Sequence, residues 1–452
     1  MNIATQNFRQ TSKKAFILTI RDLFLQKGEQ GINFSLAKRE IVTLAILILA
    51  SFAVRVLLFP LPGYRSDMTT FQAWFQTAAN VGVRTFYNSN WSDYPPVNVY
   101  LFWGFGSIAK ALSLFGTTSI VYLIKLVPNI FDAATALLIF GFVRKRFEFK
   151  MALLTTALYA FNPTVIFNTA VWGQYDAIYT FFLILSVMLA LDSKPELSAI
   201  TFALGVLTKP QGIALAPLIV FLILKKYKLQ WRRILTSLVA MVATVFLVII
   251  PFEWSNPVTF LSNIYFGAYG GYAYTSINAF NLWALVGFWL PDAPYFAIGW
   301  VLFTVVTGFT LYVLYKRFEV SGDVIVLLSA FLLFFSFFML PTRIHERYLF
   351  PAMSVLALLF PFIRKTRPLY LILTGTCLIN QAYVMYWLNA YIDEGKNYSP
   401  NFTGDPVALV VTLINLVAFL YALILMYSEL KGQLFTQPYP AATTKSIKKE
   451  AS

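Results

Sequence analysis

The chain of 452 residues is 58% apolar and only 12% charged, and its mean hydropathy is +0.67. Soluble domains carry about 25% charged residues, so this composition fits a bilayer and excludes a soluble enzyme, a disordered chain and a nucleic-acid binder, despite the net charge of +15. A single cysteine, Cys377, and a single histidine, His345, exclude a disulfide scaffold and metal sites built from several of either residue.

The first predicted element is a polar, basic tail over residues 1–40, which precedes the first long apolar run and is expected in the cytoplasm. A transmembrane domain follows over residues 41–430, and a basic cytoplasmic tail, predicted to be disordered, covers residues 431–452. Because a spanning helix needs about 20 apolar residues, the sequence predicts an all-α polytopic membrane protein with about twelve crossings and both ends inside. The predicted spans are residues 41–59, 122–143, 151–170, 177–191, 197–208, 211–224, 233–251, 296–315, 322–340, 348–363, 368–388 and 407–428.

Four segments depart from a simple pattern of crossings. Residues 197–208 and 211–224 are short, which indicates tilted or broken helices that meet near Lys209 on the outer side. Residues 95–115 and 278–290 would place basic clusters on the wrong side if they crossed. We therefore expect both to be helices in the outer interface, where amphipathic aromatic residues are common, with a crossing as the alternative.

The first outer loop, residues 60–119, contains two candidate carboxylates. Asp67 precedes an amphipathic stretch predicted to be an interfacial helix. It is a candidate helix cap and a candidate base that accepts a proton from a hydroxyl, and the two roles are compatible. Asp93 stands in Asp93-Tyr94-Pro95-Pro96, where the prolines predict an extended entry into the next helix. Asp93 is thus either a cap in a rigid turn or a second carboxylate at the same surface. The sequence contains no Asp-x-Asp pair, so it does not indicate a metal site here.

Two further segments offer polar groups on the outer side. In Trp172-Gly173-Gln174-Tyr175-Asp176, Trp172 could face a sugar ring while Gln174 and Asp176 bond hydroxyl groups; the alternative is an aromatic belt with a capping aspartate. Lys209 lies at a helix break, which suits a phosphate ligand, although a lysine can also extend to the interface for solvation alone.

The densest ionisable cluster is Arg343-Ile344-His345-Glu346-Arg347. A lone histidine is usually structural, but charges next to lipid are costly, which favours a functional cluster. The spacing of Arg343 and Arg347 predicts one shared helical face, and arginine can bind phosphate oxygens with two hydrogen bonds.

These motifs resemble a known family. Ser66-Asp67 followed by a helix, together with Asp93-Tyr94-Pro95-Pro96, resembles the first luminal loop of dolichyl-phosphate-glucose-dependent glucosyltransferases. His345-Glu346-Arg347 resembles their His-Glu-Lys motif, with arginine in place of lysine, and the segment from Trp172 to Asp176 is similar to a signature of that group and of bacterial mannosyltransferase relatives. The resemblance covers residues from about 40 to 390 and implies the GT-C fold.

The resemblance implies an inverting transferase that moves a hexose, mannose or glucose, from a polyprenyl-phosphate donor to a hydroxyl of a glycan, lipid or protein acceptor. Asp67 would be the catalytic base, and preorganised cations would offset the charge of the leaving phosphate. The residues expected at the donor phosphate are Lys209, His345, Arg347 and Arg343. Those expected at the sugar or acceptor are Asp93, Tyr94, Trp172, Gln174, Asp176 and Glu346. Because the leaving phosphate is already stable, no metal or other cofactor is expected.

The expected location is a bacterial or archaeal plasma membrane with the site on its outer face, and the endoplasmic reticulum membrane is the alternative. Two competing functions remain open at this point. A lipid-linked-sugar flippase or transporter would depend on charges within a span, such as Lys125 and Asp132, more than on Asp67. A surface-polysaccharide polymerase or ligase would use a lipid-diphosphate donor.

Overall fold

The computed structural model describes residues 36–226, 230–252, 256–396 and 399–434. Most of the two predicted tails, residues 1–40 and 431–452, lies outside the described residues. The α-helices are α2 (Lys38–Leu58), α3 (Arg65–Val81), α4 (Phe86–Ser89), α5 (Pro96–Ala111), α6 (Ile120–Arg144), α7 (Phe149–Ala160), α8 (Pro163–Ile166), α9 (Asp176–Leu191), α10 (Pro195–Val206), α11 (Ala216–Lys226), α12 (Trp231–Ile249), α13 (Pro257–Gly270), α14 (Phe296–Met339), α15 (Phe350–Leu359), α16 (Arg367–Asp393) and α17 (Pro406–Leu430).

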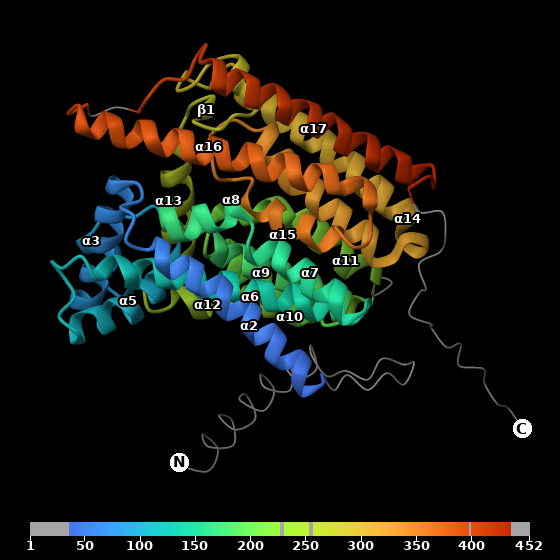
Figure 1. The fold of residues 1–452 in the computed structure, drawn as a ribbon, viewed down its shortest axis with the longest axis horizontal. Coiled ribbons are helices and arrows are strands. Elements are labelled where there is room, and N and C mark those ends of the chain that lie inside the picture. Colours follow the sequence, from blue (N-terminus) through green and yellow to red (C-terminus); the bar gives the residue numbers. More distant parts are fainter. Residues whose placement is uncertain (1–35, 227–229, 253–255, 397–398, 435–452) are drawn as a thin grey trace, which may run out of the picture.

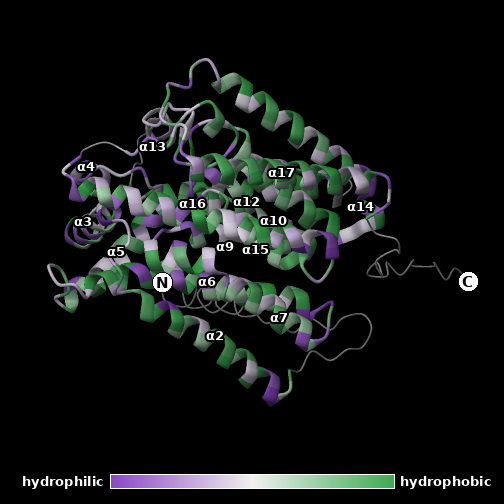
Figure 2. Cartoon of the chain, turned by 45° about the horizontal axis from the view of Figure 1, so that its top comes forward, coloured by the Kyte–Doolittle hydropathy of each residue, from purple (hydrophilic) through white to green (hydrophobic). Residues whose placement is uncertain are grey.

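The described chain is an all-α integral membrane protein, as predicted (Figure 1). By length and composition, six of its described helical segments can each cross a bilayer: α2, α6, α12, α14, α16 with the turn before it, and α17. Five shorter apolar segments accompany them. Hydrophilic residues gather toward the two ends of the bundle and apolar residues between them (Figure 2). The predicted total of about twelve crossings stays a prediction.

The longest helix, α14, has a break that the sequence predicted between residues 315 and 322. Gly322 has a φ of 52° and a ψ of −133° inside the 44-residue element, a conformation that glycine adopts without the penalty a Cβ would bring. Ion pairs hold both sides of the break: Arg317 pairs with Glu429 of α17, and Asp323 pairs with Arg146 at the end of α6. The break therefore lies at the junction of three helices.

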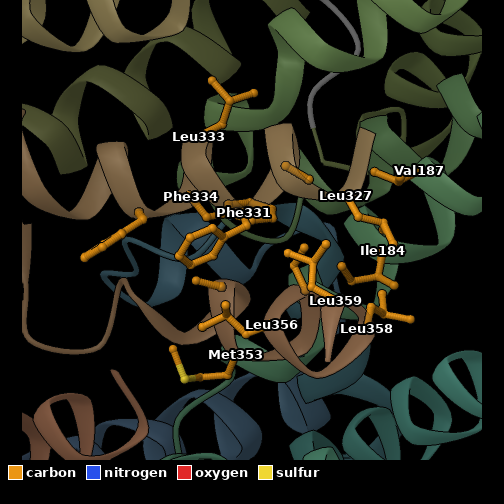
Figure 3. Packing of buried hydrophobic residues seen from close by; sticks show 14 of the residues in the cluster. Ile184, Val187, Leu327, Phe331, Leu333, Phe334, Met353, Leu356, Leu358 and Leu359 are labelled. Atoms are coloured by element: carbon orange, nitrogen blue, oxygen red, sulfur yellow. The ribbon is translucent and has the colours of Figure 1, made fainter. Parts of the chain in front are cut away.

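The main core lies around α9, the second half of α14, and α15. Nearly all of α15 is buried, and so is α14 from Val324 to Met339. Figure 3 shows Phe331, Phe334 and Leu327 of α14 packed with Leu356 and Leu359 of α15 and with Ile184 of α9. Helices that are apolar on all sides belong in such a fully enclosed position.

A smaller lobe is built from α3, α4 and α5, at one end of the bundle (Figure 1). Both predicted interfacial helices of the first outer loop are present as α3 and α5. They cross closely because Gly106 of α5 lies against the backbone of Phe75 in α3; a Cβ at Gly106 would be 2.3 Å from the Phe75 carbonyl oxygen. This packing fixes the position of the first turn of α3, which carries Asp67.

The expectation of a helix over residues 278–290 is wrong. The chain instead forms the strand β1 (Ser276–Ile277), which pairs in parallel with β2 (Ile344–His345), and a short 3₁₀ turn, η3 (Leu282–Leu285). The backbone of Asn278, Gly287 and Trp289 has positive φ values of 64°, 147° and 57°, which no right-handed helix contains. The pairing joins this segment to the His345 cluster.

Candidate functional site

Two adjoining cavities lie where α3, α13 and the segments around residues 93, 172, 209 and 345 meet. The first, here called the apolar cavity, has a volume of about 320 Å³. The second, here called the polar cavity, has a volume of about 290 Å³. They share five lining residues: Asp93, Tyr94, Tyr272, His345 and Arg347. A single elongated ligand can therefore contact both cavities.

Asp67 lines the polar cavity and is not a helix cap. The α3 helix begins at Arg65 with Tyr64 as its N-cap residue, and no side chain makes a capping hydrogen bond there. The Asp67 carboxylate instead accepts hydrogen bonds from Trp172 Nε1 at 2.8 Å and from Gln174 Nε2 at 2.5 Å. The two donors flank Gly173, whose φ of 88° ends the preceding π-helix, η1 (Phe167–Trp172), and turns the chain into α9.

Lys209 and Asp176 form a buried ion pair behind the cavities. Lys209 Nζ lies 2.6 Å from Asp176 Oδ1, and Lys209 is only 5% exposed. Arg347 approaches the other carboxylate oxygen at 3.9 Å, and Asn168 donates a hydrogen bond to it at 3.1 Å. Asp176 lines neither cavity and acts as the counterion of two cations, so the structure places it behind Lys209 and Arg347, and its predicted bond to a sugar hydroxyl stays a prediction.

The segment from Arg343 to Arg347 is not a helix, so the predicted shared face of its two arginines is wrong. The Arg343 guanidinium turns toward Asp292, with Nε and Nη2 at 2.7 and 3.2 Å from its carboxylate oxygens. Arg347 turns the opposite way, toward Asp176 and Glu346. The cause is the β2 pairing together with the φ of 65° at Arg343, both incompatible with helix. Arg343 lines only the apolar cavity, and Arg347 lines both.

Asp93 and Tyr94 lie at the boundary between the cavities. The α5 helix begins at Pro96 with Pro95 as its N-cap residue, so Asp93 is not its cap. The Tyr94 hydroxyl donates to Gln174 Oε1 at 3.3 Å, and its ring lies 5.3 Å from Lys209 Nζ. Among the described residues, Asp93 is in no ion pair, so its carboxylate is available to a ligand in either cavity.

Charges are distributed unequally between the cavities. The apolar cavity has the cations Lys209, Arg343 and Arg347 against Asp93. The polar cavity has Asp67, Asp93 and Glu346 against Arg347. An anionic group is therefore favoured at the apolar cavity, and hydroxyl groups, which donate hydrogen bonds to carboxylates, are favoured in the polar one.

Burial shifts the ionisation of these groups. It raises the pKa of Asp67, of Asp93 and of Glu346 above the usual carboxyl values, while Arg347 opposes each shift. Burial, together with Arg347 and Lys209, lowers the pKa of His345 well below its ordinary value. His345 is therefore neutral near pH 7, and its ring packs against Tyr272 and Tyr348, each at a centroid distance of 5.1 Å. The positive charge at the apolar cavity thus rests on lysine and arginine.

Several contributors were not anticipated from the sequence. Asp292 holds Arg343, Tyr272 packs on His345, and Trp74 and Trp91 line the polar cavity. Trp91 is 68% exposed at this cavity, and its carbonyl accepts a 2.7 Å hydrogen bond from Trp74 Nε1. The richness of the outer loops in aromatic residues was visible, but no local pattern showed which of them meet.

Lys125 is another buried cation, and it does not reach the ionisable cluster. Its ammonium group donates to the backbone carbonyls of Phe59, Leu61 and Val171 at 3.1, 2.6 and 2.9 Å. These carbonyls belong to the segments that lead into α3 and into Trp172. Lys125 thus ties together the two segments that hold Asp67 and its hydrogen-bond donor.

Among the described residues, no group of three or more His, Cys, Asp or Glu side chains is arranged to hold a metal ion. The carboxylates near the cavities have other partners. Asp176, Asp292 and Glu346 pair with cations, Asp67 accepts hydrogen bonds from neutral donors, and Asp93 forms no ion pair with the described residues. The expectation of a metal-independent site stays a prediction.

A comparison with known families matches part of the chain. The family model described as GPI transamidase subunit PIG-U matches residues 77–270, less than half of the chain. No curated protein matches this sequence. The matched range contains Asp93, Tyr94, the segment from Trp172 to Asp176, and Lys209, whereas Asp67 and the His345 segment lie outside it.

This match overturns the assignment made from sequence motifs. The chain is similar to a GPI transamidase subunit and not to a dolichyl-phosphate-sugar transferase. The predicted hexosyltransferase activity, the GT-C identity and the polyprenyl-phosphate-hexose donor are therefore wrong. The match gives no support to a bacterial or archaeal plasma membrane. Two of the motifs behind the resemblance lie inside the matched range, so they do not distinguish the two families.

Proposed function

We propose that this chain is a membrane subunit of a GPI-transamidase-type complex, in which it binds the phosphate-linked glycolipid that the complex uses. Transfer chemistry would belong to another subunit. The family match supports the assembly and the ligand class, and the paired cavities support the binding role. This function places the chain in the endoplasmic reticulum membrane, the second of the two locations open from the sequence.

The observation that carries the proposal is the ordered change of chemistry along the two cavities. The apolar cavity begins among Val206, Ile213, Phe266, Trp300 and Phe337. Phe266 is 73% exposed, so this end reaches the outer surface of the helices, where lipid chains lie. Lys209 and Arg347 follow, and then the carboxylates and indoles of the polar cavity. A lipid chain, a phosphate and a glycan occur in that same order in a phosphate-linked glycolipid.

The individual roles follow from this order. Lys209 and Arg347 would contact the phosphate as charge-assisted donors. Asp67, Asp93 and Glu346 would accept hydrogen bonds from glycan hydroxyls, while Trp91 and Trp172 would pack against sugar rings. His345, being neutral, would contribute a hydrogen bond or packing surface and no charge. Asp67 would be a binding group and not a base.

Binding measurements with three lipids test the proposal. Purified full-length protein is titrated with a fluorescent phosphatidylinositol glycan lipid, with phosphatidylinositol lacking the glycan, and with a neutral glycolipid of the same glycan. We expect the first to bind at least tenfold more tightly than either of the others, because only it fills both cavities and supplies the phosphate. Equal affinity for all three lipids would overturn the proposal. So would failure of the protein to bind the first lipid at all.

A further inference from the structure

A second lipid-binding feature lies far from the cavities, on the outer face of α16 and α17. A groove of about 480 Å³ runs between these helices, lined by Pro368, Leu369, Ile372, Leu413, Ile414, Val417, Ala418 and Tyr421. The two helices lie side by side (Figure 1). All of these side chains are apolar apart from the Tyr421 hydroxyl, so the groove suits a hydrocarbon chain.

The groove has a defined polar end. The Tyr421 hydroxyl donates a 3.0 Å hydrogen bond to the carbonyl oxygen of Lys365. This bond places the last groove residue of α17 beside the short turn η4 (Arg364–Thr366), directly before α16. Counted along α17 from Leu413 to Tyr421, the groove is about 12 Å long. That length is close to the depth of one leaflet, since the whole hydrocarbon core is about 30 Å thick.

Two cations lie at this end of the groove. Arg364 and Lys365 are both exposed, and neither is in an ion pair with any residue the structure describes. The neighbouring basic cluster behaves differently: Arg144, Lys145 and Arg146 pair with Glu40, Asp192 and Asp323. Phe147, next to that cluster, packs on Phe362 at a ring distance of 4.9 Å. The two basic segments therefore lie on the same side, which the sequence predicts to be cytoplasmic.

We propose that the groove between α16 and α17 binds an acyl chain of an anionic phospholipid from the cytoplasmic leaflet, with its phosphate against Arg364 and Lys365. Charge complementarity selects this occupant. A zwitterionic lipid would fill the groove, but its own ammonium group offsets the charge of its phosphate, whereas an anionic head group keeps a net negative charge beside both cations where the hydrocarbon ends. Juxtamembrane cations next to interhelical pockets are the usual recognition elements for such lipids. This site is independent of the cavities, so its failure would not affect the proposed function.

Photocrosslinking in lipid nanodiscs tests this site. The full-length protein is reconstituted with a phosphatidylserine probe or a phosphatidylcholine probe, each with a photoreactive group in its acyl chain, and the labelled peptides are mapped. We expect labelling within residues 368–372 and 413–421 to be roughly tenfold stronger for phosphatidylserine, in line with two juxtamembrane cations. The double variant Arg364→Gln/Lys365→Gln should abolish the preference.

A matched control uses Lys38→Gln/Arg39→Gln. These two cations are also adjacent, exposed and at the start of an apolar helix, α2, and the Arg144–Glu40 pair places that start near the basic cluster. This control should keep the preference. A further variant, Val417→Trp, fills the groove at a position that is 67% exposed and should reduce labelling by both probes.

Two results would overturn the proposal. These are equal labelling of the groove by the two probes, and a preference for phosphatidylserine that survives Arg364→Gln/Lys365→Gln.

Discussion

Two buried pairs of opposite charge show how similar residues take different roles in this protein. Arg55 of α2 and Asp132 of α6 lie 3.5 Å apart. Asp132 also accepts hydrogen bonds from Tyr159 and Thr169, and Arg55 donates to the Ala160 carbonyl. The space beside this pair is only about 10 Å³, hardly enough for one water molecule. It is an enclosed structural pair with no room for a ligand.

The pair of Lys209 and Asp176 differs in what lies next to it. Lys209 lines the apolar cavity, and Arg347, the second cation near Asp176, lines both cavities. Burial and pairing alone therefore do not identify a functional site in an apolar chain. The adjoining cavities, and the neighbouring carboxylate Asp93, which forms no ion pair within the described part of the chain, make the difference.

The largest expected effects come from breaking each pair. Arg55→Met should lower the free energy of unfolding by about 3–5 kcal/mol, because the buried Asp132 loses its cation. Lys209→Met should lower it less, because Arg347 stays 3.9 Å from Asp176. Double variants, in which both members of a pair are replaced, distinguish the structural pair from the pair beside the cavities. Arg55→Met/Asp132→Leu should recover most of the stability and retain glycolipid binding. Lys209→Met/Asp176→Leu should recover stability but lose at least tenfold in glycolipid affinity.

The measurement combines thermal unfolding in detergent with lipid titration of the same preparations. If both double variants bind glycolipid as tightly as the original protein, the proposed difference between the Arg55–Asp132 and Lys209–Asp176 pairs is wrong.

A smaller effect is expected at Arg343. Its guanidinium is bonded to Asp292 and to the Tyr269 carbonyl, so Arg343→Met should destabilise the β2 segment by about 1–3 kcal/mol through the unpaired buried acceptors. Glycolipid affinity should change less than for Lys209→Met/Asp176→Leu. Thermal unfolding and lipid titration measure both quantities. A loss of affinity as large as that of the Lys209 double variant would instead make Arg343 a direct phosphate ligand.

The pH dependence of binding should be moderate. Burial raises the pKa of Asp67, Asp93 and Glu346, so lowering the pH from neutral protonates them earlier than ordinary carboxyl groups. Loss of their negative charge favours an anionic ligand, and the affinity for phosphatidylinositol should rise as the pH falls. In Asp93→Asn the rise should be smaller. Titrations across this pH range check the direction, and an affinity that falls with acidity would contradict it.

The smallest effect is expected at Trp91. Since its side chain is largely exposed, Trp91→Ala should leave the unfolding temperature almost unchanged. It should weaken binding of the glycan-bearing lipid by a few fold while leaving phosphatidylinositol itself unaffected. Titrations with both lipids provide the measurement. An equal loss of affinity for both lipids would contradict a contact between Trp91 and the glycan.

The sequence was sufficient for the features that depend on local pattern. The helical membrane class follows from apolar runs, the break in α14 from the interruption between the runs 296–315 and 322–340, and α3 and α5 from their amphipathic stretches. It also identified Asp67, Trp172, Lys209 and Arg347 as candidates, and the structure brings these four together. Their proposed roles stay predictions.

Other features depend on contacts between distant segments. The strand at Ile344–His345 forms only because Ser276–Ile277 pairs with it, so the spacing of Arg343 and Arg347 misleadingly indicated a helix. Asp176 pairs with Lys209, which lies 33 residues later, and no local signal distinguishes such a counterion from a ligand-binding aspartate. The family assignment failed for a related reason: motifs of aromatic and acidic residues describe a type of surface and not its chemistry.

The most direct test of the central claim is a structure of the full-length protein with a bound phosphatidylinositol glycan lipid. The account predicts that the phosphate lies within hydrogen-bonding distance of Lys209 and Arg347, the glycan lies among Asp67, Asp93 and Trp172, and the lipid chains leave past Phe266. A glycolipid bound elsewhere, with both cavities empty at saturating ligand, would contradict it.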